Sequence, residues 1–349
     1  PEEVLAQPGV DFVCLGEGEA ALLDLVRALE AGEPLAKMRI ENIWAKGGRK
    51  TGMRPPIEPI DSLPFLARDF LDERHGVVHL TTQRGCPFPC TYCGARMYDE
   101  LYAGGPVKYG RRRSQESVIA ELVAIQREEP INYVIFLDDT FTIPHPWVRE
   151  LCKVYGERFR IPFSVHARVE TMNRELIADL ANAGCRHIVY GVESGSDRVR
   201  REIMKRVASN DRFEEVFRWT KEEGILVTAN YMLGMPGETL EEMEETIDLH
   251  HRLAPDDFSY FVFYPFPGTH LFKLCQEKGY LPADYLDRPA NHRETILDLP
   301  GVSKDEICEM YDRWTRVRTH GALARQGDDL SSEAELMTAD VIEHQAAWG

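Results

Sequence analysis

The sequence lacks a run of roughly 18 apolar residues, the length that a helix needs to cross a bilayer. Its first residues, Pro1-Glu2-Glu3, have neither the basic nor the apolar segment of a signal peptide. Positive charge is also scarce, since 41 Lys and Arg against 58 Asp and Glu give a formal net charge of −17. That charge repels a phosphate backbone, and the basic run 111–113 is short. These features predict a cytoplasmic protein with no membrane span and no nucleic-acid partner.

Cysteine is sparse as well, with eight in 349 residues, too few for a disulfide scaffold in a chain of this length. Three of the eight, Cys86, Cys90 and Cys93, fall within eight positions. In a reducing compartment such a group favours metal binding. The other five are scattered along the chain and are interpreted as free thiols in apolar surroundings.

Between about residues 77 and 277, apolar β-branched runs alternate with longer amphipathic stretches. This alternation predicts six βα units, and therefore a partial (βα)6 TIM-like barrel of the α/β class. The predicted strands are Val77–Thr82, Tyr133–Leu137, Pro162–Ala167, His187–Gly191, Leu226–Met232 and Ser259–Tyr264. The predicted helices are Gln115–Glu128, Pro146–Arg158, Arg174–Asn182, Phe213–Glu223, Leu240–Arg252 and Leu271–Glu277.

The flanking segments differ from the barrel. A strand at Asp11–Leu15, a glycine turn and a helix at Ala20–Glu30 form one unit of an open, Rossmann-like α/β sheet. A lone βα unit cannot bury both its faces, so either it docks on the barrel or the natural chain begins well upstream, which we favour. We predict four parts: 1–48, the Rossmann-like remnant; 49–74, a proline-rich linker; 75–278, the barrel; and 279–349, an extension with helices at Lys304–Arg325 and Ser331–Ala347.

The three clustered cysteines directly follow the first barrel strand. Their loop therefore lies at the carboxyl end of the sheet, where barrel active sites are built. Thiolates are the ligands that iron–sulfur clusters require, and three of them leave one iron of a four-iron cluster without a protein ligand. A structural zinc site would need a fourth ligand, and no nearby Cys or His is an obvious one. We therefore predict a [4Fe–4S] cluster on Cys86, Cys90 and Cys93, with zinc as the alternative.

In this C-x3-C-x2-C spacing, with the aromatic Tyr92 before the last cysteine, the chain resembles the radical S-adenosylmethionine (radical SAM) superfamily. It is more narrowly similar to the branch with an N-terminal cobalamin-binding domain, through the phrases at 84–88, 136–139, 191–195, 234–239 and 267–269. The resemblance implies that S-adenosylmethionine binds the open iron and that the reduced cluster cleaves it. The products are methionine and a 5′-deoxyadenosyl radical, which removes hydrogen from a small-molecule substrate.

Residues at the other strand ends are candidates for binding S-adenosylmethionine. Asp138 and Asp139 end the second strand, where carboxylates can accept bonds from the ammonium group of this ligand, although a helix cap is the alternative. By the resemblance, Arg168 faces the carboxylate of the ligand; a local ion pair with Glu170 is the alternative.

Two further strand ends supply predicted cofactor contacts. Glu193 and Ser194 close the fourth strand, where a carboxylate suits the ribose hydroxyls. The resemblance also places Met235 and Pro236, in the turn after the fifth strand, near the adenine. Both pairs have an ordinary structural alternative, as packing residues or as part of a tight turn.

The segment 11–19 resembles the last strand and turn of the cobalamin-binding domain in this branch. The turn glycines Gly16 and Gly18 would allow the backbone to approach the nucleotide tail of cobalamin. The Asp-x-His-x-x-Gly signature of some cobalamin proteins is absent. Many members of this branch lack that signature. The resemblance as a whole implies a cobalamin-dependent methyltransferase that takes electrons from an external donor such as flavodoxin or ferredoxin.

Other functions remain open at this point. A radical SAM cyclase, oxidoreductase or rearrangement enzyme would use the same barrel without methyl transfer. A methylthiotransferase acting on RNA would want a basic appendage, which the acidic C-terminal segment does not offer. A non-catalytic iron–sulfur protein would need four cluster ligands and no barrel mouth.

Overall fold

The computed structural model describes residues 1–34, 37–48, 50–68 and 74–325. Six strands form one sheet in the order β10-β9-β8-β7-β6-β3, and all neighbouring pairs are parallel. The strands are β3 (Val77–Leu80), β6 (Tyr133–Phe136), β7 (Phe163–Ala167), β8 (Cys185–Glu193), β9 (Leu226–Leu233) and β10 (Asp257–Val262). The six predicted strands and the partial barrel are confirmed.

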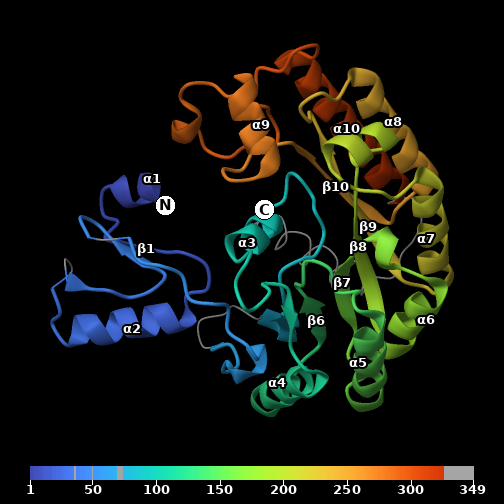
Figure 1. The fold of residues 1–349 in the computed structure, drawn as a ribbon. Coiled ribbons are helices and arrows are strands. Elements are labelled where there is room, and N and C mark those ends of the chain that lie inside the picture. The colour runs from blue at the N-terminus through green and yellow to red at the C-terminus, as the bar shows by residue number, and fades with distance from the viewer. Residues whose placement is uncertain (35–36, 49, 69–73, 326–349) are drawn as a thin grey trace.

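The predicted helices are also present, and Figure 1 shows α4 to α8 along the outer side of the sheet. Four of these five begin at a side chain that accepts a hydrogen bond from the first helical turn: Ser114, Asn173, Ser209 and Thr239. The helices are α4 (Gln115–Glu128), α5 (His145–Arg158), α6 (Arg174–Ala183), α7 (Asn210–Glu222), α8 (Leu240–Leu253) and α9 (His270–Lys278).

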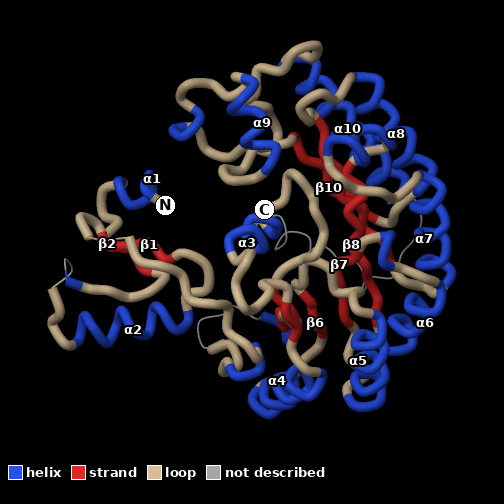
Figure 2. The backbone as a smooth tube through the Cα atoms, in the orientation of Figure 1, coloured by secondary structure: helices blue, strands red, loops and turns tan. Residues whose placement is uncertain are grey.

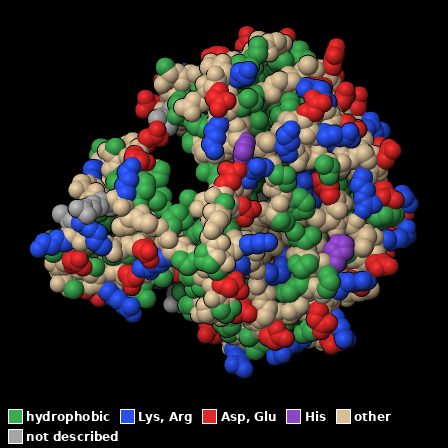
Figure 3. Space-filling model, in the orientation of Figure 1, with side chains coloured by type: hydrophobic (Ala, Val, Ile, Leu, Met, Phe, Trp, Pro, Cys, Tyr) green, Lys and Arg blue, Asp and Glu red, His purple; other side chains and the backbone are tan. Residues whose placement is uncertain are grey.

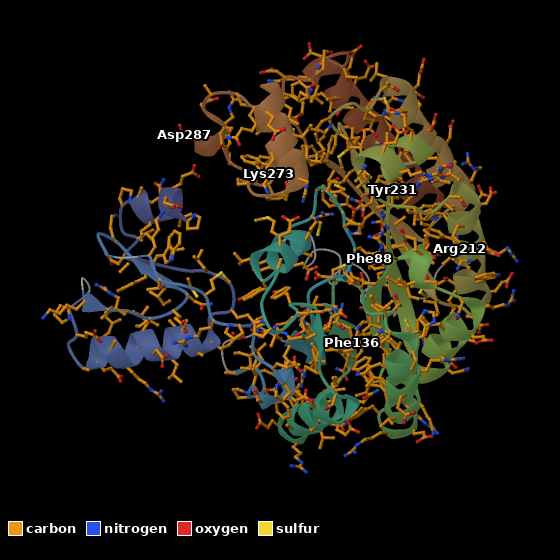
Figure 4. All side chains as sticks on the ribbon, viewed as in Figure 1. Phe88, Phe136, Arg212, Tyr231, Lys273 and Asp287 are labelled. Atoms are coloured by element: carbon orange, nitrogen blue, oxygen red, sulfur yellow. The ribbon has the colours of Figure 1, made fainter. Side chains whose placement is uncertain are left out.

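The main core lies between the sheet and these helices. Phe136, labelled in Figure 4, packs edge-on against Phe163 and Tyr155. Helix α10 (Lys304–Arg325) extends this core, because the fully buried Trp314 packs against Tyr231 and Tyr260. The helix predicted at Ser331–Ala347 lies outside the described residues. No helix in the described ranges meets the length and apolarity needed for a membrane span.

The N-terminal unit lies to one side of the barrel (Figures 1 and 2). It contains α1 (Glu2–Ala6), the predicted strand as β1 (Phe12–Cys14), the predicted helix as α2 (Glu19–Glu30), and β2 (Ile43–Ala45), which was not predicted. Strand β2 pairs antiparallel with β1, and a small core forms beneath α2. Figure 3 shows a hollow between this unit and the barrel. The division of the chain into four domains stays a prediction.

A short ribbon and a helix join the two parts. Strands β4 (Gln83–Arg84) and β5 (Arg111–Arg112) pair antiparallel, and α3 (Ala95–Leu101) follows the cysteine loop. The buried carboxylate of Glu17, from the glycine turn, forms ion pairs with Arg84 and Arg111, one on each ribbon strand. The ribbon thereby ties the N-terminal unit to the segment that leads into the cysteine loop.

Candidate active site

The cysteine loop follows β4 at the carboxyl end of the sheet, as predicted. Cys86 and Cys90 are buried and Cys93 is half-buried. Gly85 has a φ of +82°, and a Cβ there would lie 2.8 Å from the ring of Tyr109. The loop therefore needs glycine directly before its first cysteine, for both conformation and space.

The thiols have surroundings that suit ligands of a cluster. Burial raises the pKa of Cys86, and it raises the pKa of Cys93 to about 11, so a positively charged metal has to favour the thiolate form. Arg168 donates a hydrogen bond to Cys90 Sγ over 2.9 Å, and Thr140 Oγ1 lies 3.5 Å from Cys86 Sγ. These groups would stabilise negative sulfur.

The three cysteines lie close enough that Cys86 and Cys90 contribute to the raised pKa of Cys93. Among the described residues, no group of three or more His, Cys, Asp or Glu side chains converges on a single metal ion. Ligands that each bind a separate iron of one cluster need not converge on a point. Three thiols on one loop are the donor set of a [4Fe–4S] cluster with one open iron, whereas a structural zinc site, the alternative that the sequence left open, needs four ligands.

Asp138 fixes the approach to the cysteine loop. Its buried carboxylate accepts hydrogen bonds from the backbone nitrogens of Thr82, over 2.6 Å, and Gln83, over 3.0 Å, and from the Thr82 hydroxyl. Burial raises the pKa of Asp138. Because the chain itself engages both oxygens, the predicted ammonium contact would compete with these bonds. Asp139 is exposed beside the thiols, where its charge contributes to the raised pKa of Cys86 and Cys93.

Arg206 is the centre of a buried network that sequence reasoning missed. It donates hydrogen bonds to Gly191 O over 2.7 Å, Tyr92 Oη over 3.2 Å and Glu193 Oε1 over 3.4 Å. Burial raises the pKa of Glu193, against the lowering effect of Arg206. Two predicted residues, Tyr92 and Glu193, are thus held together by a third that the prediction lacked.

Arg168 forms the second buried cation of the site. Its guanidinium group lies 4.0 Å from the ring centre of Phe88, which Figure 4 labels on the cysteine loop, and it pairs with Glu170 over 2.7 Å. The predicted ion pair with Glu170 and the placement beside the cluster loop therefore both occur. The Nε atoms of Arg168 and Arg206 and Oε2 of Glu170 are buried without a hydrogen-bond partner in the described residues. The network therefore retains hydrogen-bonding capacity for a ligand that carries both a positive and a negative group.

Ser194 is not brought together with these residues. Its buried hydroxyl lies 3.5 Å from Thr246 Oγ1 of α8 and accepts a bond from the backbone of Ser196. The neighbouring Gly195 packs so tightly that a Cβ would lie 2.2 Å from Glu245 O. The structure gives Ser194 a packing role on the helix side, which differs from the predicted cofactor contact.

Met235 and Pro236 lie in the turn after β9, and both are buried. Met235 packs with Val199, Met204 and Phe263, a cluster that Tyr92 of the cysteine loop also contacts. The turn is held by Glu238, whose Oε2 accepts a hydrogen bond from Met235 N over 3.0 Å. The predicted pair therefore lies beside the loop, within an apolar cluster.

The N-terminal glycine turn borders a pocket of about 580 Å³. Gly16 and Gly18 line it, together with Arg84 and the rings of Tyr98 and Tyr109, whose centres are 5.2 Å apart in a stacked pair. A Cβ on Gly16 would lie 2.0 Å from Tyr102 Oη, so this glycine allows the turn to pack on the barrel. The two predicted glycines are thus brought to a shared pocket between the two parts of the chain.

Comparison with known proteins decides the family. The Radical SAM superfamily profile matches residues 80–250, which include all three cysteines and the Arg206 network. The chain belongs to the radical SAM superfamily. It is 30% identical over 279 residues to an uncharacterised methyltransferase of Pyrococcus horikoshii, covering 77% of this chain and 58% of that protein.

Solved structures of superfamily members have the same fold. The cobalamin-dependent radical enzyme OxsB, with aqua-cobalamin and S-adenosylmethionine bound, matches 96% of this chain and 55% of its own, with a TM-score of 0.70 and 17% identity. The methyltransferase TsrM from Kitasatospora setae, with cobalamin and a [4Fe–4S] cluster bound, matches 77% and 56%, with a TM-score of 0.63 and 20% identity. This radical SAM chain spans just over half the length of these proteins.

Glu238 gives this radical SAM chain a pH-dependent stability. Burial raises the pKa of Glu238 to about 8 from the usual 4.5, and its Oε1 has no hydrogen-bond partner among the described residues. The folded state therefore holds this proton more tightly than the unfolded chain. The resulting stability is complete below about pH 4.5 and is lost as the pH rises through 8, roughly 3–5 kcal/mol in all.

We expect Glu238→Gln to remove most of this loss. Urea unfolding at pH 5 and pH 8 measures it, with exposed Glu241→Gln on α8 as the matched control. The loss of stability between these pH values should shrink in Glu238→Gln and persist in the control. An equal loss in both variants would contradict the assignment.

Proposed function

We propose that this chain is the radical SAM part of a cobalamin-dependent methyltransferase that acts on a small molecule. When bound, the [4Fe–4S] cluster would supply the electron that cleaves S-adenosylmethionine, and cobalamin would supply the methyl group. The reaction needs a substrate and a reductant. We propose flavodoxin or ferredoxin as the reductant. The observation that carries the proposal is the pocket between the glycine turn and Tyr98 of α3, the helix that follows the cysteine loop, because it supports a second ligand site near the first.

The residues of the chain would bind and orient S-adenosylmethionine. Cys86, Cys90 and Cys93 would hold three irons and leave the fourth for this ligand. Arg168 and Arg206 would meet the carboxylate of the ligand, since each retains an unused N–H. Glu193 would accept bonds from the ribose hydroxyls.

The N-terminal pocket would hold part of cobalamin. Its volume of about 580 Å³ is within the usual range for a drug-sized ligand. It therefore fits the nucleotide tail of cobalamin and not the whole cofactor. Gly16 and Gly18 would line the tail, and the stacked Tyr98 and Tyr109 rings would offer it an apolar face.

The test uses the full-length gene product with a reconstituted cluster, S-adenosylmethionine, a reductant and cob(I)alamin. Radical cleavage gives 5′-deoxyadenosine, whereas methylation of cobalt gives S-adenosylhomocysteine, and chromatography separates the two. We expect both products, with S-adenosylhomocysteine lost and 5′-deoxyadenosine kept when cobalamin is left out. Formation of 5′-deoxyadenosine alone, with cobalamin present, would favour the cyclase, oxidoreductase or rearrangement alternatives.

A further inference from the structure

The inner face of the barrel sheet carries polar side chains. In β7, β9 and β10, residues such as Val165, Ala229 and Tyr260 belong to the core under the helices. Alternate residues of a strand face opposite sides, so His166, Asn230 and Ser259 face inward. All three are half-buried. A barrel interior usually packs branched apolar residues, so polar residues here need an explanation.

Within the described part of the chain, the side chains of His166, Asn230 and Ser259 have no hydrogen-bond partner. On the same face, His187 Nε2 and Thr228 Oγ1 pair with each other over 2.7 Å. Among the described residues, none forms a hydrogen bond with the side chains of His166, Asn230 or Ser259, and none of these three side chains is a buried polar group without a partner, so solvent reaches them. Asn230 and Ser259 are also register partners on β9 and β10, which puts an amide beside a hydroxyl. Because these polar groups are half-buried and open to solvent, a ligand can replace water as their hydrogen-bond partner, so the wall is suited to a ligand.

An apolar wall continues from this polar pair. Met232 and Phe261 follow on the same faces of β9 and β10 and are again register partners. The Phe261 ring contacts His292 edge-on, with ring centres 5.7 Å apart, and Phe266 is 44% exposed beside them. Met232 also packs against the apolar cluster that Tyr92 of the cysteine loop contacts. The wall therefore leads to the loop that would hold the cluster.

The charges on this wall favour a neutral ligand. None of the described inward-facing residues of β7, β9 and β10 is a Lys or Arg. Arg168, directly after β7, already pairs with Glu170 and Cys90. Burial lowers the pKa of His166 to about 4, so its ring is neutral at physiological pH. Arg168 and Arg206 are assigned to the carboxylate of S-adenosylmethionine, so an anionic substrate on this wall would lose its hydration without gaining a further counter-charge.

We propose that Asn230, Ser259, Met232 and Phe261 form the substrate wall, and that the substrate is an uncharged molecule with a flat, unsaturated ring system and a hydrogen-bonding group. This inference rests on the proposed function, because it places the substrate beside the site where the radical forms. Asn230 and Ser259 form hydrogen bonds with the polar group of the substrate, whereas Phe261 and Met232 pack against its ring. Asn230 and Ser259 thus determine specificity.

Two isosteric probes that differ in charge test this wall: quinoline-4-carboxamide and quinoline-4-carboxylate. Equilibrium dialysis against full-length, anaerobically reconstituted protein measures their binding. We expect the carboxamide to bind at least about tenfold more tightly than the carboxylate, since the latter lacks a counter-charge. Asn230→Ala and Ser259→Ala should each weaken carboxamide binding about fivefold. Exposed Asn182→Ala on α6 is the matched control and should change nothing.

Phe261→Leu keeps the wall apolar but removes the ring, so it should weaken both probes by a similar factor. Equal or tighter binding of the carboxylate would overturn the charge argument. No carboxamide binding at millimolar concentration, or unchanged binding in both wall variants, would overturn the wall. The same samples are assayed for 5′-deoxyadenosine without probe. If 5′-deoxyadenosine forms but the probe does not bind, only the proposal of a substrate wall is contradicted. If the probe binds but cobalamin-dependent S-adenosylhomocysteine is absent, only the proposed methyltransferase function is contradicted.

Discussion

Replacing Cys86, Cys90 and Cys93 together by Ala should reduce the iron content of anaerobically reconstituted protein from about four atoms per chain to almost none. The visible absorbance of the cluster and the formation of 5′-deoxyadenosine should disappear with it. The physical reason is that no other three thiols lie on one described loop. The remaining cysteines are scattered over distant elements.

The triple variant should still fold, because none of its three cysteines belongs to the large core between the sheet and the helices. Circular dichroism would check this. Cys152 and Cys185 provide the matched control, since both are buried thiols of the large core between the sheet and the helices. Their replacement by Ala should leave four irons in place. A complete cluster in the triple variant would refute the assignment of its ligands.

The barrel itself is well predicted from sequence, because a strand covered on both sides is a continuous apolar run. Strand β6, Tyr133–Phe136, is buried along its whole length and agrees with its predicted bounds within one residue. The ribbon strands β4 and β5 were missed, since two residues each carry no periodic signal. Strand β2 of the N-terminal unit has only three residues and was also missed.

The site was predicted in its positions along the chain but not in its side-chain directions. At the end of β8 the pairing register shifts between Gly191 and Glu193, and Glu193 has a φ of +71°. This irregularity leaves Glu193 with Arg206 and turns Ser194 toward α8. Simple alternation along the strand cannot reveal such a shift.

Arg206 was missed because it follows a short π-helix, Val199–Ile203, and not a strand end. In the sequence it is one of several arginines between 198 and 212, and most of the others bind carboxylates, those of Asp197, Glu215 and Glu242. Only the three-dimensional path of this loop brings Arg206 across to Tyr92. The sequence feature that could have indicated Arg206 as a site residue was a cationic side chain in the long segment between a strand and the helix that follows it. This feature is common, so it is a weak indication.

Replacing Arg206 by Met should destabilise the fold more than any other single substitution proposed for this chain. Arg206 is buried, and its removal would leave the carboxylate of Glu193 without its counter-charge, whereas Glu170 would keep Arg168. Breaking a buried ion pair from one side typically costs about 3–5 kcal/mol. We expect the free energy of unfolding, measured by urea at neutral pH, to fall by that amount.

The same substitution should weaken binding of S-adenosylmethionine, because Tyr92 and Glu193 would lose the group that holds them together. Calorimetry on the reconstituted protein below its unfolding midpoint measures this separately from stability. We expect a loss of about 1–3 kcal/mol in binding free energy, the cost of an unpaired buried polar group. Arg206→Lys should recover part of the stability, since it restores the charge but not the three hydrogen bonds.

Two comparisons separate this network from ordinary ion pairs. Arg174 pairs with Glu222 on an exposed surface, so Arg174→Met should change the free energy of unfolding by less than about 1 kcal/mol. In Arg206→Met, a second change of Glu193→Gln should recover stability, because it removes the unpaired charge that the first change creates. Additive losses in the double variant would show that the two residues act independently, and would return Arg206 to a packing role.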